Sequence, residues 1–355
     1  PACRAELVVD AYTLEPLHER NAGRLLPTAS MIKMLTGLVA ADAVAKGEVD
    51  WDTPYTVSHE AALVGGSQVY LEEGETFTLE ELLRATMIES ANDAAFAVAE
   101  LVAGSEEAFV GRMRAKARDL GLEGFRIYSP NGLPNEETAS RDDRLTARQL
   151  ATIGQAVLAE PQLAEYAQTP LSWFRDHTFQ LFSFNYLLRR YEPAMGIKTG
   201  YHRRADFNVT AAAEQDGARL IAVLMGCERK GQLFGRAEEL FEASFDRYRP
   251  VTVVSRGERL EAAVSVDGAA AAVPVVAARA VHLALPRGVT VPIDLLVVPD
   301  GAQAPVAAGE PVGRIVVRQG ERVIGETPAL AAEAVAEVPW WQRMWNRFAA
   351  AIALA

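Results

Sequence analysis

The stretch FNVTAAAEQDGARLIAVLM, residues 207–225, decides the fold class of this chain. Its two apolar halves have the composition of strands, and the Asp216-Gly217 pair between them is typical of a hairpin turn. Residues 5–10 alternate as a further strand near the start of the chain. Strands so far apart are buried only if they join one sheet, with the intervening helices packed on it. The pattern therefore predicts an α+β domain.

Helices are expected on both sides of this hairpin in the sequence. Apolar residues over 30–46 recur at helical spacing, and Thr78 with Glu81 has the pattern of a capping box at the start of the next helix. Further helices are predicted over 93–103, 105–121, 146–168 and 236–248. We therefore assign residues 1–248 to the first domain.

The composition changes after Arg249-Pro250. Residues 251–327 hold short Val-rich runs that are separated by turn dipeptides such as Asp267-Gly268 and Asp300-Gly301. This spacing is typical of a small all-β domain, which we place over 249–338.

Residues 339–355 form a third unit with a two-sided helical pattern. Pro339 suits the first position of a helix. One face would carry Trp341, Met344, Trp345, Phe348 and Ile352, and the other Gln342, Arg343, Asn346 and Arg347. Such an amphipathic helix is typical of a segment that lies in a membrane interface and anchors a protein there. A helix that caps the β domain or contacts a second copy is the alternative.

The composition excludes several classes of function. The 355 residues carry a formal net charge of −12, which argues against a nucleic-acid partner. Five histidines without ligand spacing and only two cysteines predict neither a metal site nor a cofactor. No apolar run reaches the roughly 18 residues that would predict a transmembrane helix.

Two polar motifs lie at the starts of predicted helices. Ser30 and Lys33 are one turn apart and share a face. A lysine whose pKa is lowered by burial or by a second cation can take the proton of a serine nucleophile. Ser90 and Asn92 lie in a short loop that would project them into a cleft.

A third motif, Lys198-Thr199-Gly200, ends a short strand just before the hairpin. An edge strand can pair with a peptide, and its Lys and Thr can bind a carboxylate. Gly200 would let a ligand approach the backbone closely. Each motif alone is equally typical of a structural role, as a helix cap or an ordinary turn. Their joint occurrence in this order is the informative observation.

The three motifs resemble those of penicillin-binding proteins. PTASMIKMLT (27–36) is similar to P-A-S-x-T-K-x-M-T, MIESANDAA (87–95) to x-I-x-S-G-N-D-A, and GIKTG (196–200) to D-G-x-K-T-G. With the β domain and the tail, the resemblance to the type-5 D-alanyl-D-alanine carboxypeptidases of peptidase family S11 covers nearly the whole chain. It implies a β-lactamase/transpeptidase-like domain, in which helices flank an antiparallel five-stranded sheet.

The resemblance implies how the reaction would proceed. Ser30 would attack the carbonyl between two terminal D-Ala residues of a peptidoglycan stem peptide, and Lys33 would take its proton. Ser90, helped by Lys198, would relay a proton to the leaving amine. Water would then hydrolyse the acyl-enzyme, which penicillin would trap.

Further residues would bind the substrate. Asn92 would hold its amide, and Thr199 would receive its terminal carboxylate, with Arg236 as a more distant aid. The backbone N–H groups of Ser30 and Tyr201 would form the oxyanion hole, next to Gly200.

Three positions depart from the family pattern. Ile32 replaces the usual Thr, Tyr201 replaces the His common after KTG, and Phe184 lies nearest to where some relatives have an Arg. In the family sheet the first strand pairs with the last, so Cys3 and Cys227 would be neighbours. Two alternatives are open: a disulfide between these cysteines, or two unpaired thiols.

The chain is therefore expected to be an acyl-serine carboxypeptidase of the periplasm. Its partners would be stem peptides, β-lactams and, through the tail, the surface of the inner membrane, after export by a signal peptide outside this sequence. A β-lactamase or a DD-endopeptidase with the same residues is an alternative, although Glu160 lacks the Asn that should follow in E-x-x-L-N. A catalytically weak peptidoglycan-binding scaffold is another.

Overall fold

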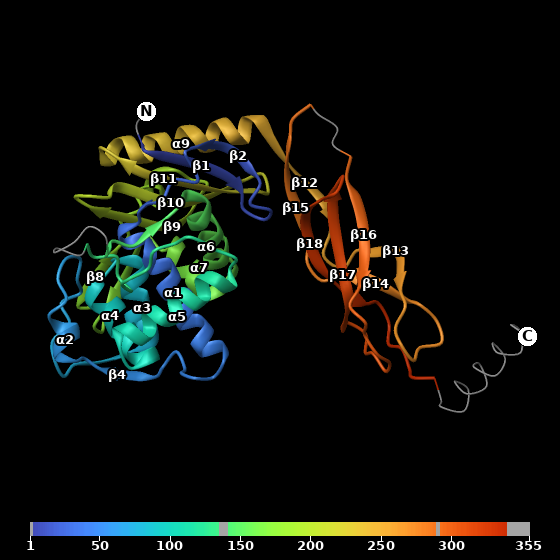
Figure 1. Cartoon of the computed structure of the whole chain (residues 1–355), viewed down its shortest axis with the longest axis horizontal. Coiled ribbons are helices and arrows are strands. Elements are labelled where there is room, and N and C mark those ends of the chain that lie inside the picture. The colour runs from blue at the N-terminus through green and yellow to red at the C-terminus, as the bar shows by residue number, and fades with distance from the viewer. Residues whose placement is uncertain (1–2, 135–140, 289–291, 339–355) are drawn as a thin grey trace, which may run out of the picture. The chain divides into compact units, whose positions relative to one another are not determined.

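A computed structural model describes residues 3–134, 141–288 and 292–338 (Figure 1). The chain divides into two compact units after Arg247, one residue before the predicted boundary. Each unit has its own hydrophobic core. The predicted amphipathic helix over 339–355 lies outside the described residues. Among the helices within the described ranges, none combines the length and the apolar character needed to cross a membrane.

A five-stranded antiparallel sheet organises the first unit, as predicted. The strands follow the order β2-β1-β11-β10-β9. Their bounds are β1 (Ala5–Asp10), β2 (Pro16–Arg20), β9 (Ala194–His202), β10 (Asp206–Gln215) and β11 (Ala218–Cys227). The first strand pairs with the last, so that Ala5 lies opposite Met225 and Asp10 opposite Leu220. This pairing joins the two ends of the unit in one sheet, and it leaves β9 as an edge strand.

Cys3 and Cys227 form a disulfide beside this pairing. The bond connects the residues just before β1 and at the end of β11, which are 224 positions apart in the sequence. A cross-link over so long a loop restricts the unfolded chain and so favours the folded sheet.

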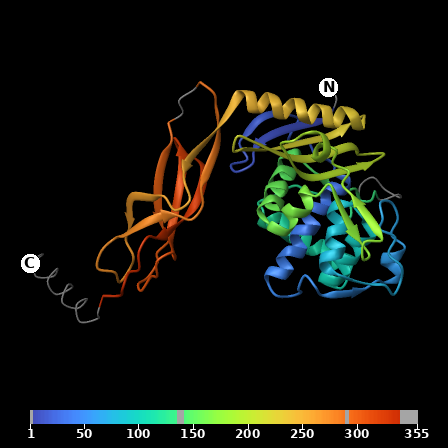
Figure 2. The ribbon, with the colours of Figure 1, turned by 180° about the vertical axis from the view of Figure 1, so that it is seen from behind.

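Helices cover both faces of the sheet (Figures 1 and 2). The helix α9 (Lys230–Arg247) contacts one face through β10 and β11, and α6 (Ala147–Ala159) lies against the other. The remaining helices of that layer are α1 (Lys33–Ala45), α2 (His59–Ala62), α3 (Leu79–Ile88), α4 (Asn92–Ala103), α5 (Glu106–Asp119) and α7 (Pro161–Gln168). The short helix α8 (Leu187–Arg190) contacts β9, and its Arg190 binds Glu238 of α9. Burial on both faces explains why every residue of β1 is inaccessible.

The helix predicted over 146–168 is two helices in the structure. The helix α6 ends at Ala159 and α7 begins at Pro161, with Glu160 in an extended conformation between them. Proline has no N–H to continue the first helix but suits the first position of a new one, so the chain bends at this point.

The segment before Ser30 is fixed by short pairings. The strand β3 (Leu26–Pro27) pairs with β6 (Arg144–Leu145), and Thr28 donates its N–H to the carbonyl of Asp143 at 2.9 Å. Two more pairs, at the periphery of the helical layer, are β4 (Pro54–Thr56) with β5 (Thr76–Thr78) and β7 (Leu171–Phe174) with β8 (Phe179–Phe182). The pairing of β3 with β6 holds the residues just before Ser30 against the rest of the first unit.

The second unit is all-β, as predicted. Its five-stranded sheet has the order β13-β14-β18-β17-β16, and β12 pairs with β15. The bounds are β12 (Tyr248–Val254), β13 (Arg259–Val264), β14 (Val273–Ala277), β15 (Val281–Pro286), β16 (Asp294–Pro299), β17 (Pro311–Gln319) and β18 (Arg322–Ala331). Val275, Val312 and Ile315 lie at the centre of its core and are completely buried.

Candidate active site

Ser30 and Lys33 lie on consecutive turns at the start of α1. Ser30 is part of a 3-10 turn, η1 (Ala29–Ile32), and Lys33 is the first residue of the α-helix. The helix α1 is buried on nearly every side, so its first residue has no route to solvent. The amine of Lys33 lies 3.0 Å from the hydroxyl oxygen of Ser30. The structure thus brings the predicted nucleophile and its predicted base into direct contact.

Two carbonyl oxygens also contact the amine of Lys33. The side-chain oxygen of Asn92 lies at 2.6 Å and the backbone oxygen of Asn131 at 2.8 Å. A neutral amine has two N–H donors and one lone pair. If the two N–H groups donate to these carbonyls, the lone pair points at Ser30 and can accept its proton.

The surroundings of Lys33 favour this neutral form. Its side chain is fully buried, and burial lowers the pKa of Lys33 well below the ordinary 10.5. The positive charge of Lys198 lowers that pKa further, whereas Asp93 and Asp143 oppose the shift. Both conditions that a basic lysine requires are therefore met here.

Ser90 and Lys198 are the other two predicted catalytic residues, and both are buried. Ser90 follows α3 with a φ of 62°, and it is almost inaccessible. It does not cap α4, because the N-cap residue of that helix is Ala91. Burial lowers the pKa of Lys198 to about 7, although Glu89 acts in the other direction. A lysine with such a pKa can gain and lose a proton near neutral pH, which a proton relay needs.

The strand β9 runs directly over the turn that carries Ser30. A Cβ atom added to Gly200 would lie 2.5 Å from the carbonyl oxygen of Thr28 and 3.1 Å from the backbone nitrogen of Ser30. Only glycine allows this approach. Tyr201 follows on the strand, where its ring stacks on Phe207 at 4.4 Å between centroids.

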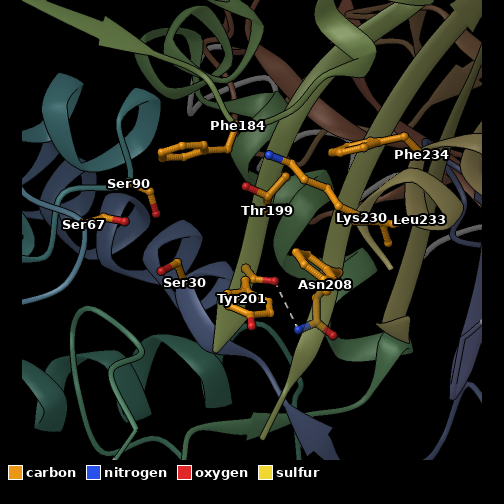
Figure 3. Close-up of a pocket in the computed structure, with 12 residues that line it drawn as sticks. Ser30, Ser67, Ser90, Phe184, Thr199, Tyr201, Asn208, Lys230, Leu233 and Phe234 are labelled. Carbon is orange, nitrogen blue, oxygen red and sulfur yellow. Dashed lines mark hydrogen bonds between the residues drawn. The ribbon is translucent and has the colours of Figure 1, made fainter. Parts of the chain in front are cut away.

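These elements enclose a cavity of about 240 Å³ (Figure 3). In Figure 3, Ser30 and Ser90 face Thr199 and Tyr201 of β9 across this space. The predicted residues that line it are Ser30, Ser90, Thr199, Gly200 and Tyr201. Residues that no short motif identified also line it, namely Ser67, Phe184, Phe207, Asn208, Lys230, Leu233 and Phe234.

Asn92 lies behind the cavity. Its side chain accepts a hydrogen bond from Lys33 and donates one to the carbonyl of Gly65 at 2.8 Å. The structure therefore places Asn92 where it orients Lys33, and both of its polar ends are in use. Lys33 and Lys198 are buried and are not among the residues that line the cavity.

Arg236, predicted to aid carboxylate binding from a distance, does not line the cavity. Its guanidinium contacts the buried carboxylate of Glu6 at 3.1 Å and also Glu239. Arg20 and His18 bind the same carboxylate. Burial alone would raise the pKa of Glu6, but these three partners hold it at about 2. Arg236 thus stabilises the packing of α9 on β1, which its place in the sequence did not reveal.

Comparisons with known proteins agree with this geometry. The sequence matches the family described as D-alanyl-D-alanine carboxypeptidase over residues 2–229 and the penicillin-binding protein 5 C-terminal domain over residues 248–337. D-alanyl-D-alanine carboxypeptidase DacF of Bacillus subtilis is 28% identical over 336 residues, which cover 93% of this chain and 85% of that protein. DacB2 of Mycobacterium tuberculosis, also named a D-alanyl-D-alanine carboxypeptidase, is 31% identical over 246 residues, or 67% of this chain and 81% of that protein.

Solved structures share the fold. The peptidoglycan synthesis regulatory factor PBP3 of Streptococcus pneumoniae superposes with a TM-score of 0.80 at 24% identity, covering 94% of this chain and 99% of that one. Penicillin-binding protein 5 of Haemophilus influenzae superposes with a TM-score of 0.73 at 22% identity, covering 95% and 98%.

The close approach of β9 predicts the effect of one added methyl group. Gly200→Ala should force β9 away from Ser30 and lower the rate of acylation by penicillin by about 100-fold or more, because small displacements of reacting groups are costly. Gly235→Ala is the control, since a Cβ there meets no atom within 4 Å. Acylation followed by stopped-flow fluorescence would contradict this account of β9 if both variants reacted like the wild type.

The lowered pKa of Lys33 predicts the pH dependence of acylation. The rate should rise with pH as the amine of Lys33 loses its proton, and this rise should lie well below pH 10.5. Lys198→Met removes a neighbouring positive charge, so the rise should move to higher pH. The exposed Lys46→Met variant should leave it unchanged. A wild-type rise near pH 10.5 would show that Lys33 is an ordinary ammonium.

Proposed function

The chain belongs to the D-alanyl-D-alanine carboxypeptidases, a family of serine-type enzymes, and on that premise we propose that Ser30 carries the chemistry. The enzyme removes the terminal D-Ala from peptidoglycan stem peptides through an acyl-enzyme, and penicillins acylate the same serine. The observation that supports this assignment best is the 3.0 Å contact between the hydroxyl of Ser30 and the buried amine of Lys33.

Acylation begins with proton transfer from Ser30 to the neutral amine of Lys33. The hydroxyl oxygen attacks the carbonyl carbon between the two D-Ala residues, and negative charge develops on the carbonyl oxygen. The backbone N–H groups of Ser30 and Tyr201 stabilise that charge. The C–N bond then breaks. The proton that Lys33 took from Ser30 passes through Ser90, assisted by Lys198, to the departing amine of D-Ala, so that Lys33 is neutral again.

Deacylation returns the enzyme to its starting state. A water molecule gives up a proton to Lys33 and attacks the ester carbon, and the bond to Ser30 breaks as its oxygen regains a proton. The shortened stem peptide leaves as a carboxylic acid. In a β-lactam the leaving nitrogen stays attached to the acyl group through the ring system. It therefore remains in the cavity, where it hinders the approach of water.

The position of Glu160 argues against the alternative function of a β-lactamase. This residue lies at the junction of α6 and α7 and does not line the cavity that contains Ser30. A deacylating carboxylate has to reach a water molecule beside the acyl-enzyme.

The enzyme acts in the periplasm, attached to the surface of the inner membrane through residues 339–355. The sequence of this segment supports the proposal, since it predicts a helix with Trp and Phe on one face and Arg on the other.

Replacing the nucleophile tests the catalytic assignment. Ser30→Ala should abolish the covalent adduct with labelled penicillin and lower D-Ala release from a stem pentapeptide by at least about 1,000-fold. Ser67→Ala, which removes another hydroxyl from the same cavity, should keep the adduct. An adduct that persists in Ser30→Ala would refute the assignment. Rapid turnover of penicillin by the wild type would favour a β-lactamase. If the wild type reacted with neither penicillin nor the pentapeptide, a scaffold protein would be favoured.

Membrane attachment is tested by flotation with anionic vesicles. The full chain should float with the vesicles, and a chain that ends at Glu337 should stay in the dense fraction, because it lacks the apolar face that would enter the interface. A full chain that carries Trp341→Ser and Trp345→Ser should behave like the truncated chain. Equal flotation of the full and truncated chains would show that residues 339–355 are not the anchor.

A further inference from the structure

One cation in the cavity has no part in the mechanism above. Lys230 is the first residue of α9 and lines the cavity together with Thr199. Its ammonium nitrogen lies 4.1 Å from the centroid of the Tyr186 ring and 5.9 Å from that of Phe184. Figure 3 shows the amino group pointing toward the end of the cavity where Phe184 and Thr199 meet. The cation is therefore held in place by aromatic faces.

Lys230 differs from the neighbouring cations in its partners. Arg236 on the same helix binds Glu6 and Glu239, and Arg190 binds Glu238. Within the part of the chain that the structure describes, no carboxylate forms a salt bridge with Lys230. Aromatic rings accept the charge of a cation but do not use up its N–H donors, so these remain available to a ligand in the cavity.

The reaction requires such a cation. A carboxypeptidase cleaves only the last residue, and the carboxylate of that residue brings a negative charge into the cavity. Lys33 and Lys198 are buried and do not line the cavity, and the mechanism uses them as neutral or proton-exchanging groups. Arg236 is bound to Glu6. Among the residues that the structure describes, Lys230 is thus the one lysine or arginine that lines the cavity.

The walls around Lys230 strengthen its attraction for an anion. Phe184, Leu233 and Phe234 line the same part of the cavity, and their apolar side chains reduce the number of water molecules that can solvate the ammonium group. Attraction between opposite charges increases as the surroundings become less polar. A hydroxyl and an ammonium group, from Thr199 and Lys230, together suit the two oxygens of one carboxylate.

We propose that Lys230 determines the specificity of this enzyme for a free carboxyl terminus. Lys230 and Thr199 bind the terminal carboxylate of the substrate, and a peptide bond that continues beyond the scissile residue leaves Lys230 without its anion. This assignment rests on the proposed function, because it names the group that selects the substrate of that reaction. It also explains how the site distinguishes a carboxypeptidase substrate from an endopeptidase substrate.

Paired substrates test this role of Lys230. An acylated Lys-D-Ala-D-Ala peptide is compared with the same peptide ending in a carboxamide, and release of D-Ala or D-alaninamide is measured for each. Lys230→Met should lower kcat/KM for the acid by about 10- to 100-fold and leave the amide nearly unchanged, since only the acid loses a charged partner. Lys230→Arg should keep most of the preference for the acid.

Controls separate this role from a structural one. Arg229→Met removes an exposed cation next to Lys230 and should change neither rate. Equal losses on both peptides in Lys230→Met, or an unchanged preference for the acid, would overturn the proposal. Wild-type protein that releases neither D-Ala from the acid nor D-alaninamide from the amide would refute the proposed function instead. In that case, the acylation rates of wild type and Lys230→Met with benzylpenicillin, which has a free carboxylate, and with its methyl ester, which has none, would still test the role of Lys230.

Discussion

The buried amine of Lys33 is the constraint on which the site depends. An amine with no access to water needs polar partners, and it finds them in Ser30, Asn92 and the carbonyl of Asn131. These partners come from three separate parts of the chain. Satisfying one amine therefore fixes the turn before α1, the start of α4 and the loop around Asn131 relative to one another. The same burial makes the amine a base.

The sheet supplies the other half of the site. Pairing of β1 with β11, and the disulfide beside it, fix the centre of the sheet, and β10 then holds β9 at the edge. That edge strand passes close enough to Ser30 that position 200 admits only glycine. On the other face, Arg236 and Glu6 hold α9 against β1, so the first turn of α9 keeps Lys230 at the cavity. Residues far from the reacting serine thus determine what the cavity presents to a substrate.

The sequence allowed much of this arrangement to be predicted. Ser30 and Lys33 were recognisable because one helical turn brings their side chains together whatever the rest of the fold does. The sheet was predictable because terminal strands can be buried only by pairing. The end of α6 could have been predicted from Pro161, a local signal that the apolar periodicity over 146–168 obscured. The roles of Arg236 and Lys230 could not be predicted, since the helix was expected only from residue 236, whereas α9 begins at Lys230. Their different partners, Glu6 for one and two aromatic rings for the other, are tertiary contacts.

The central claim is that Lys33 is a neutral base because the fold buries it. Its protonation can be followed directly by NMR in protein labelled with ¹³C at the lysine Cε atoms, with Lys33→Arg used to identify the resonance. The account predicts that the Lys33 signal titrates well below pH 10.5 while the protein stays folded. A Lys33 signal that remains in the protonated position up to the ordinary range of lysine would contradict it.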